Sequence, residues 1–296
     1  MEPLERKVAD FIQSHALFAR GGRILLAISG GADSVALLHV MHRLIQEGIV
    51  TADLLCAHLN HRLRGAAGDG DEAFVVEQAR ELGLPIVVRS LDVESQAREH
   101  RLSTETAARQ LRLASLAEIA LGERCSSVAL GHQKNDNAET VLQRLKRGTG
   151  FRGLGGIRPS RPARENVTLV RPLLCCSRGE IVDYLRTGNV SWREDHTNAD
   201  CNYTRSRIRH RVLPLLQGES SGSLTDELDG LSRSAARLQD RIAREASTVI
   251  EGGARFVSSR AAIDAKVLGV LPEAVAVEVF RQLLTQLGLG ERNLGG

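Results

Sequence analysis

The chain has 296 residues, a length that can bury one large hydrophobic core or two smaller ones. Its net charge is +3, and its five cysteines form no C-x-x-C pair, which argues against zinc ribbons and cysteine-ligated iron–sulfur clusters. The sequence contains no apolar run of about 18 residues, so it predicts no membrane span, and an odd number of cysteines without a signal peptide favours the reducing cytoplasm.

Apolar runs of strand length alternate with helix-period segments through the first two thirds of the chain. We expect a leading amphipathic helix over 4–19, strands at 24–28, 53–58, 85–89, 126–130 and 167–173, and helices at 35–47, 71–82 and 103–121. The small and polar residues 65–70 predict a loop. The alternation predicts an α/β fold with a doubly wound parallel sheet. Ligands of such sheets bind beyond the carboxyl ends of the strands, so the loops after the first, second and fourth strands should meet in one crevice.

The composition changes near residue 215. The elements expected after it are a linker at 218–223, a long helix at 224–250, and shorter helices near 260–270 and 272–287. We therefore expect an α/β domain over 1–215 and a C-terminal α-helical module over 216–296. No helix-terminating pattern precedes Gly296, so we expect the module to be cut short there.

The segment between the first predicted strand and its helix reads SGGADS. Its members, the candidate phosphate-binding residues, are Ser29, Gly30, Gly31, Ala32, Asp33 and Ser34. Two adjacent glycines let backbone N–H groups approach an anion, the helix N-terminus adds a partial positive charge, and the serines can donate hydrogen bonds. The segment lacks the lysine of a Walker A loop, and it resembles instead the pyrophosphate loop of N-type ATP pyrophosphatases, which cleave ATP to AMP and pyrophosphate. An ordinary glycine-rich turn is the alternative interpretation.

Charged side chains near this loop suit the same ligand. A carboxylate beside phosphates is repulsive unless a cation bridges the two groups, so Asp33 implies Mg²⁺ together with ATP. In the helix expected at 103–121, Glu105, Arg109 and Arg112 lie at positions i, i+4 and i+7. One interpretation is a solvated Glu–Arg face, and the other is that Arg112 points at the phosphates of a nucleotide.

A second polar segment, GHQKNDNAET at 131–140, follows the fourth predicted strand. If a helix begins near residue 135, Asp136 and Glu139 lie three residues apart on one face of it. His132 lies just before this helix. Such a set can bind an ammonium group, hold a metal ion or move a proton. The alternative is a helix cap in which Glu139 completes a capping box.

Arginine supplies nearly all of the basic side chains, because lysine occurs only at positions 7, 134, 146 and 266. The basic residues also cluster. Residues 144–178 contain nine of them and a single acidic residue, and a second cluster comprises Arg205, Arg207, Arg209 and Arg211. Guanidinium groups match phosphates and stack on bases, so the clusters predict a polyanionic partner.

Taken together, these segments resemble one family, the bacterial tRNA(Ile)-lysidine synthetases. The matching pieces, in the family's order, are SGGADS, HLNHRLR, ETAARQLR, GHQKNDNAET, RGTGFRGLGG, RPLL, WREDHTN and YTRSRIR. The loop motif alone is shared with GMP synthetases, NAD synthetases and thiolating tRNA enzymes, whereas RGTGFRGLGG together with WREDHTN is far more specific. The family usually has Tyr at the position of Leu113 and Asn at that of Ser206, and both departures concern packing or local hydrogen bonds.

The resemblance implies an ATP-dependent ligase that uses Mg²⁺. ATP would adenylate O2 of cytidine 34 in the isoleucine tRNA with a CAU anticodon, and free L-lysine would then attack C2 and displace AMP. The product is lysidine, which changes codon reading from AUG to AUA. The implied roles are phosphate binding by residues 29–34, Mg²⁺ binding by Asp33, binding and deprotonation of the lysine ammonium by Asp136 and Glu139, further lysine contacts by His132 and Arg205, and neutralisation of phosphate charge by Arg112.

Other classes of function stay open at this point. A PP-loop enzyme that thiolates tRNA is expected to need cysteines for sulfur or for an iron–sulfur cluster, and the sequence has no C-x-x-C. An NAD synthetase or amidotransferase-type enzyme should lack the basic clusters. An RNA-binding protein with a relict loop would show no ATP–pyrophosphate exchange. The oligomeric state is open, with a homodimer as one candidate, and we expect the C-terminal tRNA-binding domain of longer family members to be missing.

Overall fold

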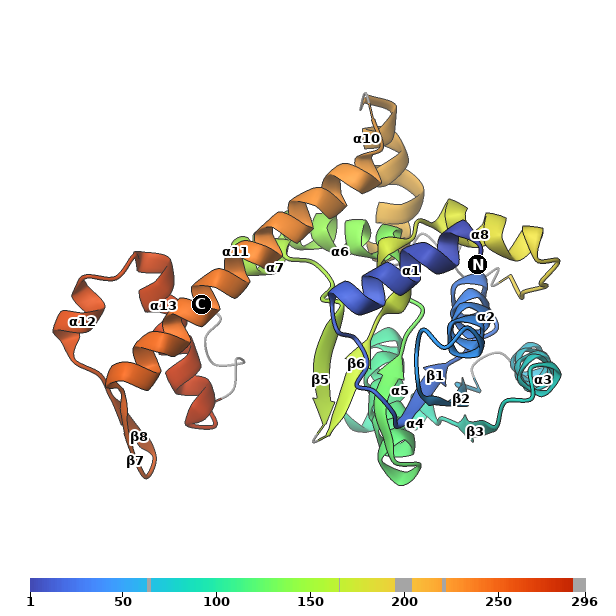
Figure 1. Ribbon diagram of the computed structural model, residues 1–296, viewed down its shortest axis with the longest axis horizontal. Helices are drawn as coiled ribbons and strands as arrows, with labels where there is room; N and C mark the ends of the chain where they lie inside the picture. Colours follow the sequence, from blue (N-terminus) through green and yellow to red (C-terminus); the bar gives the residue numbers. More distant parts are fainter. Residues whose placement is uncertain (63–64, 165, 195–203, 220–221, 290–296) are drawn as a thin grey trace. The chain divides into compact units, whose positions relative to one another are not determined.

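The computed structural model describes residues 1–62, 65–164, 166–194, 204–219 and 222–289 (Figure 1). The chain packs as two units. The first comprises Met1–Gln143 and Ile157–Asp229, and the second comprises Arg144–Gly156 and Gly230–Gly296. None of the described helices is both long and apolar enough to cross a membrane.

The described part of the first unit is built on a six-stranded sheet with the order β3-β2-β1-β4-β6-β5. The strands are β1 (Arg23–Ala27), β2 (Asp53–Asn60), β3 (Ile86–Ser90), β4 (Cys125–Ala129), β5 (Ser160–Arg164) and β6 (Val167–Val170). All of the pairings are parallel except that of β5 with β6. Because the strand order reverses beside β1, a crevice is expected where β1 and β4 end.

Helices cover both faces of this sheet (Figure 1). Successive residues of a strand point to opposite faces, so Ile24 and Leu26 of β1 join one core cluster and Leu25 joins another. The helices that supply the first cluster are α1 (Pro3–Ser14), α2 (Ala32–Gln46), α3 (Ala66–Glu81) and α8 (Arg178–Thr187). The second cluster is supplied by α5 (Thr104–Gly122). The predicted doubly wound α/β sheet is therefore confirmed.

The sequence-based boundaries differ from the observed ones where tertiary contacts decide. The leading helix ends at Ser14 rather than at residue 19, and the loop predicted at 65–70 is wrong because α3 begins at Ala66. The side-chain amide of Asn60 donates hydrogen bonds to Asp69 and Glu72, which holds this early part of α3 against the end of β2. Three elements were not expected from the sequence: β5, α4 (Val93–Glu99) and α8.

The first unit ends with three short helical segments and the start of a long helix. The segments are α9 (Thr204–Arg207), the π-helical η3 (Ile208–Val212) and α10 (Leu213–Glu219), and the 3₁₀ helix η1 (Pro172–Cys175) precedes α8. The helix α6 (Lys134–Arg147) and the long helix α11 (Leu224–Gly253) each begin in the first unit and end in the second. A helix near residue 135 and a long helix at 224–250 are thus both confirmed.

The second unit packs around α11. Its other elements are α7 (Phe151–Leu154), the hairpin β7 (Arg255–Val257) and β8 (Arg260–Ala262), α12 (Ala265–Gly269) and α13 (Glu273–Gln286). The core is formed by Ala246, Ile250, Val275, Val279 and Leu283. The predicted helical module is confirmed in class, although part of the helix expected at 260–270 is a β-hairpin. The predicted domain boundary at residue 216 stays a prediction.

Candidate active site

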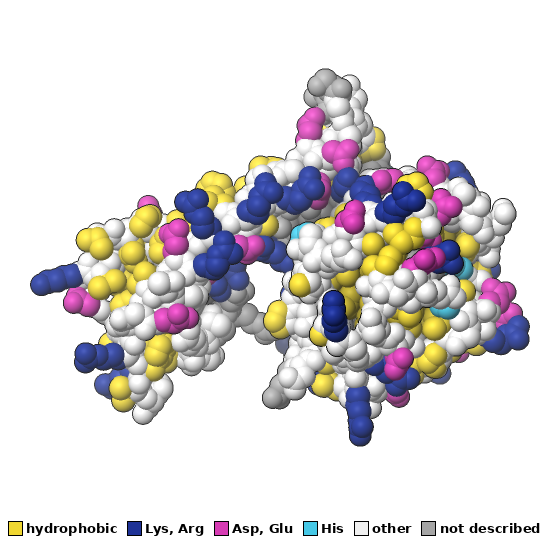
Figure 2. Space-filling model, in the orientation of Figure 1, with side chains coloured by type: hydrophobic (Ala, Val, Ile, Leu, Met, Phe, Trp, Pro, Cys, Tyr) yellow, Lys and Arg dark blue, Asp and Glu magenta, His cyan; other side chains and the backbone are white. Residues whose placement is uncertain are grey.

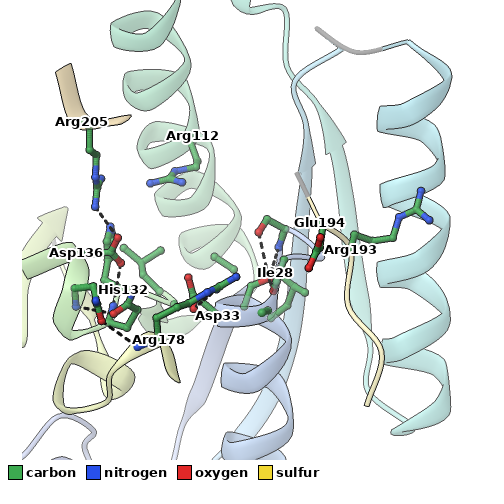
Figure 3. Close-up of a pocket in the computed structure, with 18 of the residues that line it drawn as sticks. Ile28, Asp33, Arg112, His132, Asp136, Arg178, Arg193, Glu194 and Arg205 are labelled. Atoms are coloured by element: carbon green, nitrogen blue, oxygen red, sulfur yellow. Dashed lines mark hydrogen bonds and ion pairs between the residues drawn. The ribbon is translucent and has the colours of Figure 1, made fainter. Parts of the chain in front are cut away.

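A cavity of about 1280 Å³ lies at the carboxyl ends of β1, β2 and β4, within the first unit (Figure 3). The loops that follow these three strands line it, as the strand–helix alternation predicts. The cavity wall includes Ser29, Gly31, Ala32, Asp33, Ser34, Arg112, His132, Asp136, Glu139 and Arg205. Except for Gly30, the candidate site residues therefore all line the same cavity.

The loop at 29–34 has the geometry of an anion cradle. Gly30 has φ = +89°, a conformation that glycine adopts without steric cost, and Gly31 is the N-cap of α2. The Ser34 hydroxyl accepts a hydrogen bond from the Ser29 backbone N–H at 3.1 Å and donates one to the Gly31 carbonyl at 2.9 Å. Ser34 thus closes the loop on itself, while the free N–H groups of the first turn of α2 remain available to an anion.

Gly131 lets the loop after β4 approach this cradle closely. A β-carbon at Gly131 would lie 3.0 Å from the Asp33 carbonyl oxygen and 3.2 Å from the Ser34 backbone nitrogen. Backbone atoms cannot yield to such a contact as the end of a flexible side chain can. The absence of a side chain at Gly131 is therefore what brings the start of α6, with its carboxylates, beside the phosphate loop.

The two carboxylates of α6 are buried in this wall. The side chain of Glu139 is 1% exposed and that of Asp136 is 11% exposed. Asp136 Oδ2 accepts a hydrogen bond from the Gln133 backbone N–H at 3.0 Å, so Asp136, the third residue of α6, has the capping role that the helix-cap interpretation gave to Glu139, and Glu139 instead contacts arginines. Arg205 binds both acids, with 2.7 Å from Nη2 to Asp136 and 2.7 Å from Nε to Glu139. The two carboxylates therefore act as one anionic group.

Asp33 lies at the first turn of α2 and faces Arg178. Burial raises the pKa of Asp33, Arg178 opposes this increase through an ion pair of 2.6 Å, and the negative charge of Asp136 adds to it. A further cation here would relieve the cost of the buried charge. Among the described residues no group of three or more His, Cys, Asp or Glu side chains could hold a metal by itself. Asp33 nevertheless fits Mg²⁺, which proteins commonly hold with one or two carboxylates and the phosphates of a substrate.

Two further predicted site residues, His132 and Arg112, form no ion pair within the described part of the chain. His132 is largely buried, and this burial together with Arg171 lowers its pKa to about 3, so the imidazole is neutral at physiological pH. Its Nδ1 has no hydrogen-bond partner among the described residues. Arg112 points into the cavity (Figure 3) and makes no ion pair or hydrogen bond within the described part of the chain. A guanidinium that lines a cavity without a carboxylate partner suits an anionic ligand.

Three arginines of this site were not among the residues predicted from the sequence. Arg178 faces Asp33, and Arg209 joins Arg205 on the two acids. Arg193 donates its backbone N–H to the Gly30 carbonyl at 2.9 Å and its Nε to Asp71 at 3.1 Å. The four-residue spacing of Arg205 and Arg209 could have placed both on one helical face. The remainder of the WREDHTN piece, from residue 195, lies outside the described residues.

Comparison with known proteins shows the class of protein to which this chain belongs. A family model described as a PP-loop domain matches residues 1–216. Among solved structures, the U34-tRNA thiolase NcsA from Methanococcus maripaludis, described with its [4Fe-4S] cluster, is similar with a TM-score of 0.64. It is 19% identical in sequence and covers 78% of each chain, which is a likeness of fold. The sheet and the cradle therefore define a PP-loop protein.

Curated relatives show to which family of PP-loop proteins the chain belongs. The tRNA(Ile)-lysidine synthase of Chlorobaculum tepidum is 39% identical over 251 residues, which are 85% of this chain and 74% of the relative. The enzyme of the same name from Dehalococcoides mccartyi is 42% identical over 218 residues, which are 72% of this chain and 46% of the relative. That of Geobacter sulfurreducens is 40% identical and is covered over 48% of its length. The chain belongs to the tRNA(Ile)-lysidine synthase family, although it spans about half the length of several of these relatives.

Proposed function

We propose that this protein ligates free L-lysine to C2 of cytidine 34 in the isoleucine tRNA with a CAU anticodon, with consumption of ATP. AMP and pyrophosphate are released, and the lysidine formed reads AUA instead of AUG. The main support for the proposal is that the candidate phosphate-binding loop and two buried carboxylates line the same cavity. Membership in the family supports it. We place the reaction in the cytoplasm and keep a homodimer as the candidate assembly.

The first step is activation of the base. The cytidine carbonyl is a poor electrophile and its oxygen is a poor leaving group, and adenylation of O2 remedies both. The loop at 29–34 holds the phosphates of ATP through backbone N–H groups, and Arg112 offsets the charge that develops on them. Asp33 would hold Mg²⁺, and the ion would supply positive charge to offset the negative charge of the phosphates.

The second step is attack by the lysine amine. An ammonium group is not a nucleophile, so the side chain of the substrate must lose a proton close to the base. Asp136 and Glu139 bind the ammonium and accept this proton. His132 is neutral and therefore adds a polar contact without repelling the cation. Arg205 is the partner of the lysine carboxylate, a role that requires its guanidinium to leave the two acids.

Incorporation of labelled lysine tests the proposal. We expect the purified chain to transfer labelled lysine to the CAU-anticodon isoleucine transcript only with ATP, and to leave a transcript with uridine at position 34 unlabelled. Asp136→Asn should still bind ATP but form no lysidine, because the ammonium loses its acceptor. Asp10→Asn, which changes an exposed aspartate of α1, is the matched control and should keep full activity. Near-normal turnover by Asp136→Asn would exclude the proposed role of that residue.

A further inference from the structure

The two acids that the proposed function assigns to the substrate ammonium already hold two guanidinium groups. Arg205 contacts both carboxylates at 2.7 Å. Arg209 contacts Glu139 Oε1 through Nε at 2.5 Å and Asp136 Oδ1 through Nη2 at 3.3 Å. Figure 3 shows Arg205 reaching down to Asp136 from the edge of the cavity. Two positive charges thus balance two negative ones at the place where a free amino acid would bring its own cation.

We infer that Arg205 and Arg209 occupy the ammonium site as an internal substitute for the substrate, so that residues 204–212 compete with free lysine for Asp136 and Glu139. The inference rests on the proposed function. It assigns to Arg209 a role in setting the affinity for lysine. Only the fraction of molecules whose acids are released can bind the amino acid, so the apparent affinity is reduced by that fraction.

Burial explains why the exchange needs a replacement cation. Glu139 is almost fully buried, and a buried carboxylate that loses its partner strongly destabilises the fold, because its charge is then left without compensation. The guanidinium groups therefore leave at low cost only when another cation arrives. An ammonium group can meet this requirement with three N–H donors, so free lysine and the arginines exclude each other.

The segment that carries the two arginines is suited to move. It consists of a four-residue α-helix, α9, followed by five π-helical residues, η3. A π-helical stretch is uncommon and often marks a functional site. Among residues 205–212 only Ile208 is buried, so little packing holds the segment in place. Both arginines also line the cavity that contains the phosphate loop, so the released guanidinium groups can pair with nucleotide phosphates.

If the released arginines pair with nucleotide phosphates, the binding of the nucleotide and the binding of lysine should be coupled. A nucleotide that attracts the released arginines favours the open form, and lysine favours the same form. Each ligand should therefore raise the affinity of the other. The coupling should become smaller when Arg209 no longer carries a guanidinium.

Calorimetric lysine binding to the whole chain tests the inference. We expect Arg209→Gln to bind L-lysine about fivefold more tightly than the wild type without nucleotide, as expected for loss of a competing, partly exposed ion pair. Arg209→Lys, which keeps the positive charge but lacks the forked guanidinium group, should have an intermediate affinity for lysine. Arg211→Gln removes an exposed arginine from the same segment and should bind like the wild type. Unchanged or weaker binding by Arg209→Gln would overturn the inference.

Hydrogen exchange on the wild-type protein gives a second measurement that needs no variant. Saturating lysine should increase amide exchange in residues 204–212, because the segment leaves the acids. Slower exchange there would contradict the competition and indicate that Arg209 remains on the two acids when lysine is bound. If the wild type forms lysidine but Arg209→Gln binds lysine less tightly, only this inference fails. If the wild type neither binds nor transfers lysine, the proposed function and the inference fail together.

Discussion

At the scale of single residues, two opposing effects determine the pKa of Asp33. Burial raises its pKa, and Arg178 works against that increase from the first turn of α8. Removal of Arg178 leaves the carboxylate with a higher pKa, because the group that favours its charged form is gone. The carboxylate then becomes protonated at a higher pH as the solution is acidified. Its contribution to cation binding should disappear over the same range.

We therefore predict that Arg178→Gln binds Mg·ATP several-fold less tightly than the wild type and that the deficit grows as pH falls below neutrality. Titration calorimetry at several pH values measures it. Arg186→Gln is the matched control, since Arg186 is an exposed arginine of the same helix. Equal pH profiles for Arg178→Gln and the wild type would show that Arg178 does not govern the charge of Asp33.

His132 gives a prediction about stability. The unfolded chain takes up a proton near the ordinary histidine pKa of 6.5, whereas the folded protein keeps His132 neutral down to about pH 3. Between these values the unfolded state binds more protons, so the free energy of unfolding falls as the pH falls. From pH 7 to pH 5 this residue should cost about 1–2 kcal/mol.

Urea unfolding at both pH values, on the wild type and on His132→Gln, isolates this contribution. The variant should lose about 1–2 kcal/mol less than the wild type, because it has no imidazole to protonate. The other histidines with lowered pKa values, such as His39 and His61, are present in both proteins and cancel in the difference. Equal losses in the two proteins would mean that His132 is not kept neutral by the fold.

At the scale of elements, the contact between the end of β4 and the start of α2 decides whether the site exists. Gly131→Ala would force a methyl group against the backbone of Asp33 and Ser34. We predict that the change lowers the free energy of unfolding by about 1–3 kcal/mol and weakens ATP binding, since the loop at 29–34 must shift. Gly122→Ala, where nothing lies within 4 Å of the added carbon, should leave both quantities near the wild-type values.

The elements that the sequence predicted well are those whose signals are local. The strand β1, its glycine turn and α2 follow from an apolar run, SGGADS and a helix period that ends at Gly48, which has φ = +71°. Ser103 likewise caps α5 by accepting a hydrogen bond from the Thr106 backbone. By contrast, β5 contains a proline and is mostly exposed at the edge of the sheet, so neither its pattern nor its propensity marked it as a strand.

The candidate site was predictable to a similar degree. The motifs placed the phosphate loop, His132 and the two acids at strand ends, and the parallel sheet brought them together. Which cation faces which carboxylate depends on contacts between residues far apart in the chain. Arg178 lies 145 residues after Asp33, and Arg209 lies 70 residues after Glu139. The basic cluster at 205–211 predicts a surface for a polyanion, whereas two of its arginines face carboxylates in the structure.

At the scale of the whole molecule, basic residues are concentrated in a way that the net charge of +3 conceals. Figure 2 shows Lys and Arg side chains gathered over α11. Four exposed arginines of this helix, spaced by four, four and three residues, share one face in the second unit: Arg233, Arg237, Arg241 and Arg244. A stripe of guanidinium groups along a helix matches the phosphate backbone of RNA. We therefore assign this face to the proposed tRNA partner.

Salt dependence of tRNA binding tests this assignment. Arg241 forms an ion pair with Glu245, so Arg237 and Arg244 are the better positions to change. We predict that the double variant Arg237→Gln and Arg244→Gln binds all tRNAs more weakly. Its slope of log affinity against log salt should be smaller by about one for each phosphate that the variant no longer neutralises. Lysine affinity should stay unchanged, because the carboxylates of α6 are not altered.

Arg80→Gln, which removes an exposed arginine paired with Glu77 in α3, should keep the wild-type slope. A double variant with an unaltered slope would move the RNA-binding surface away from α11.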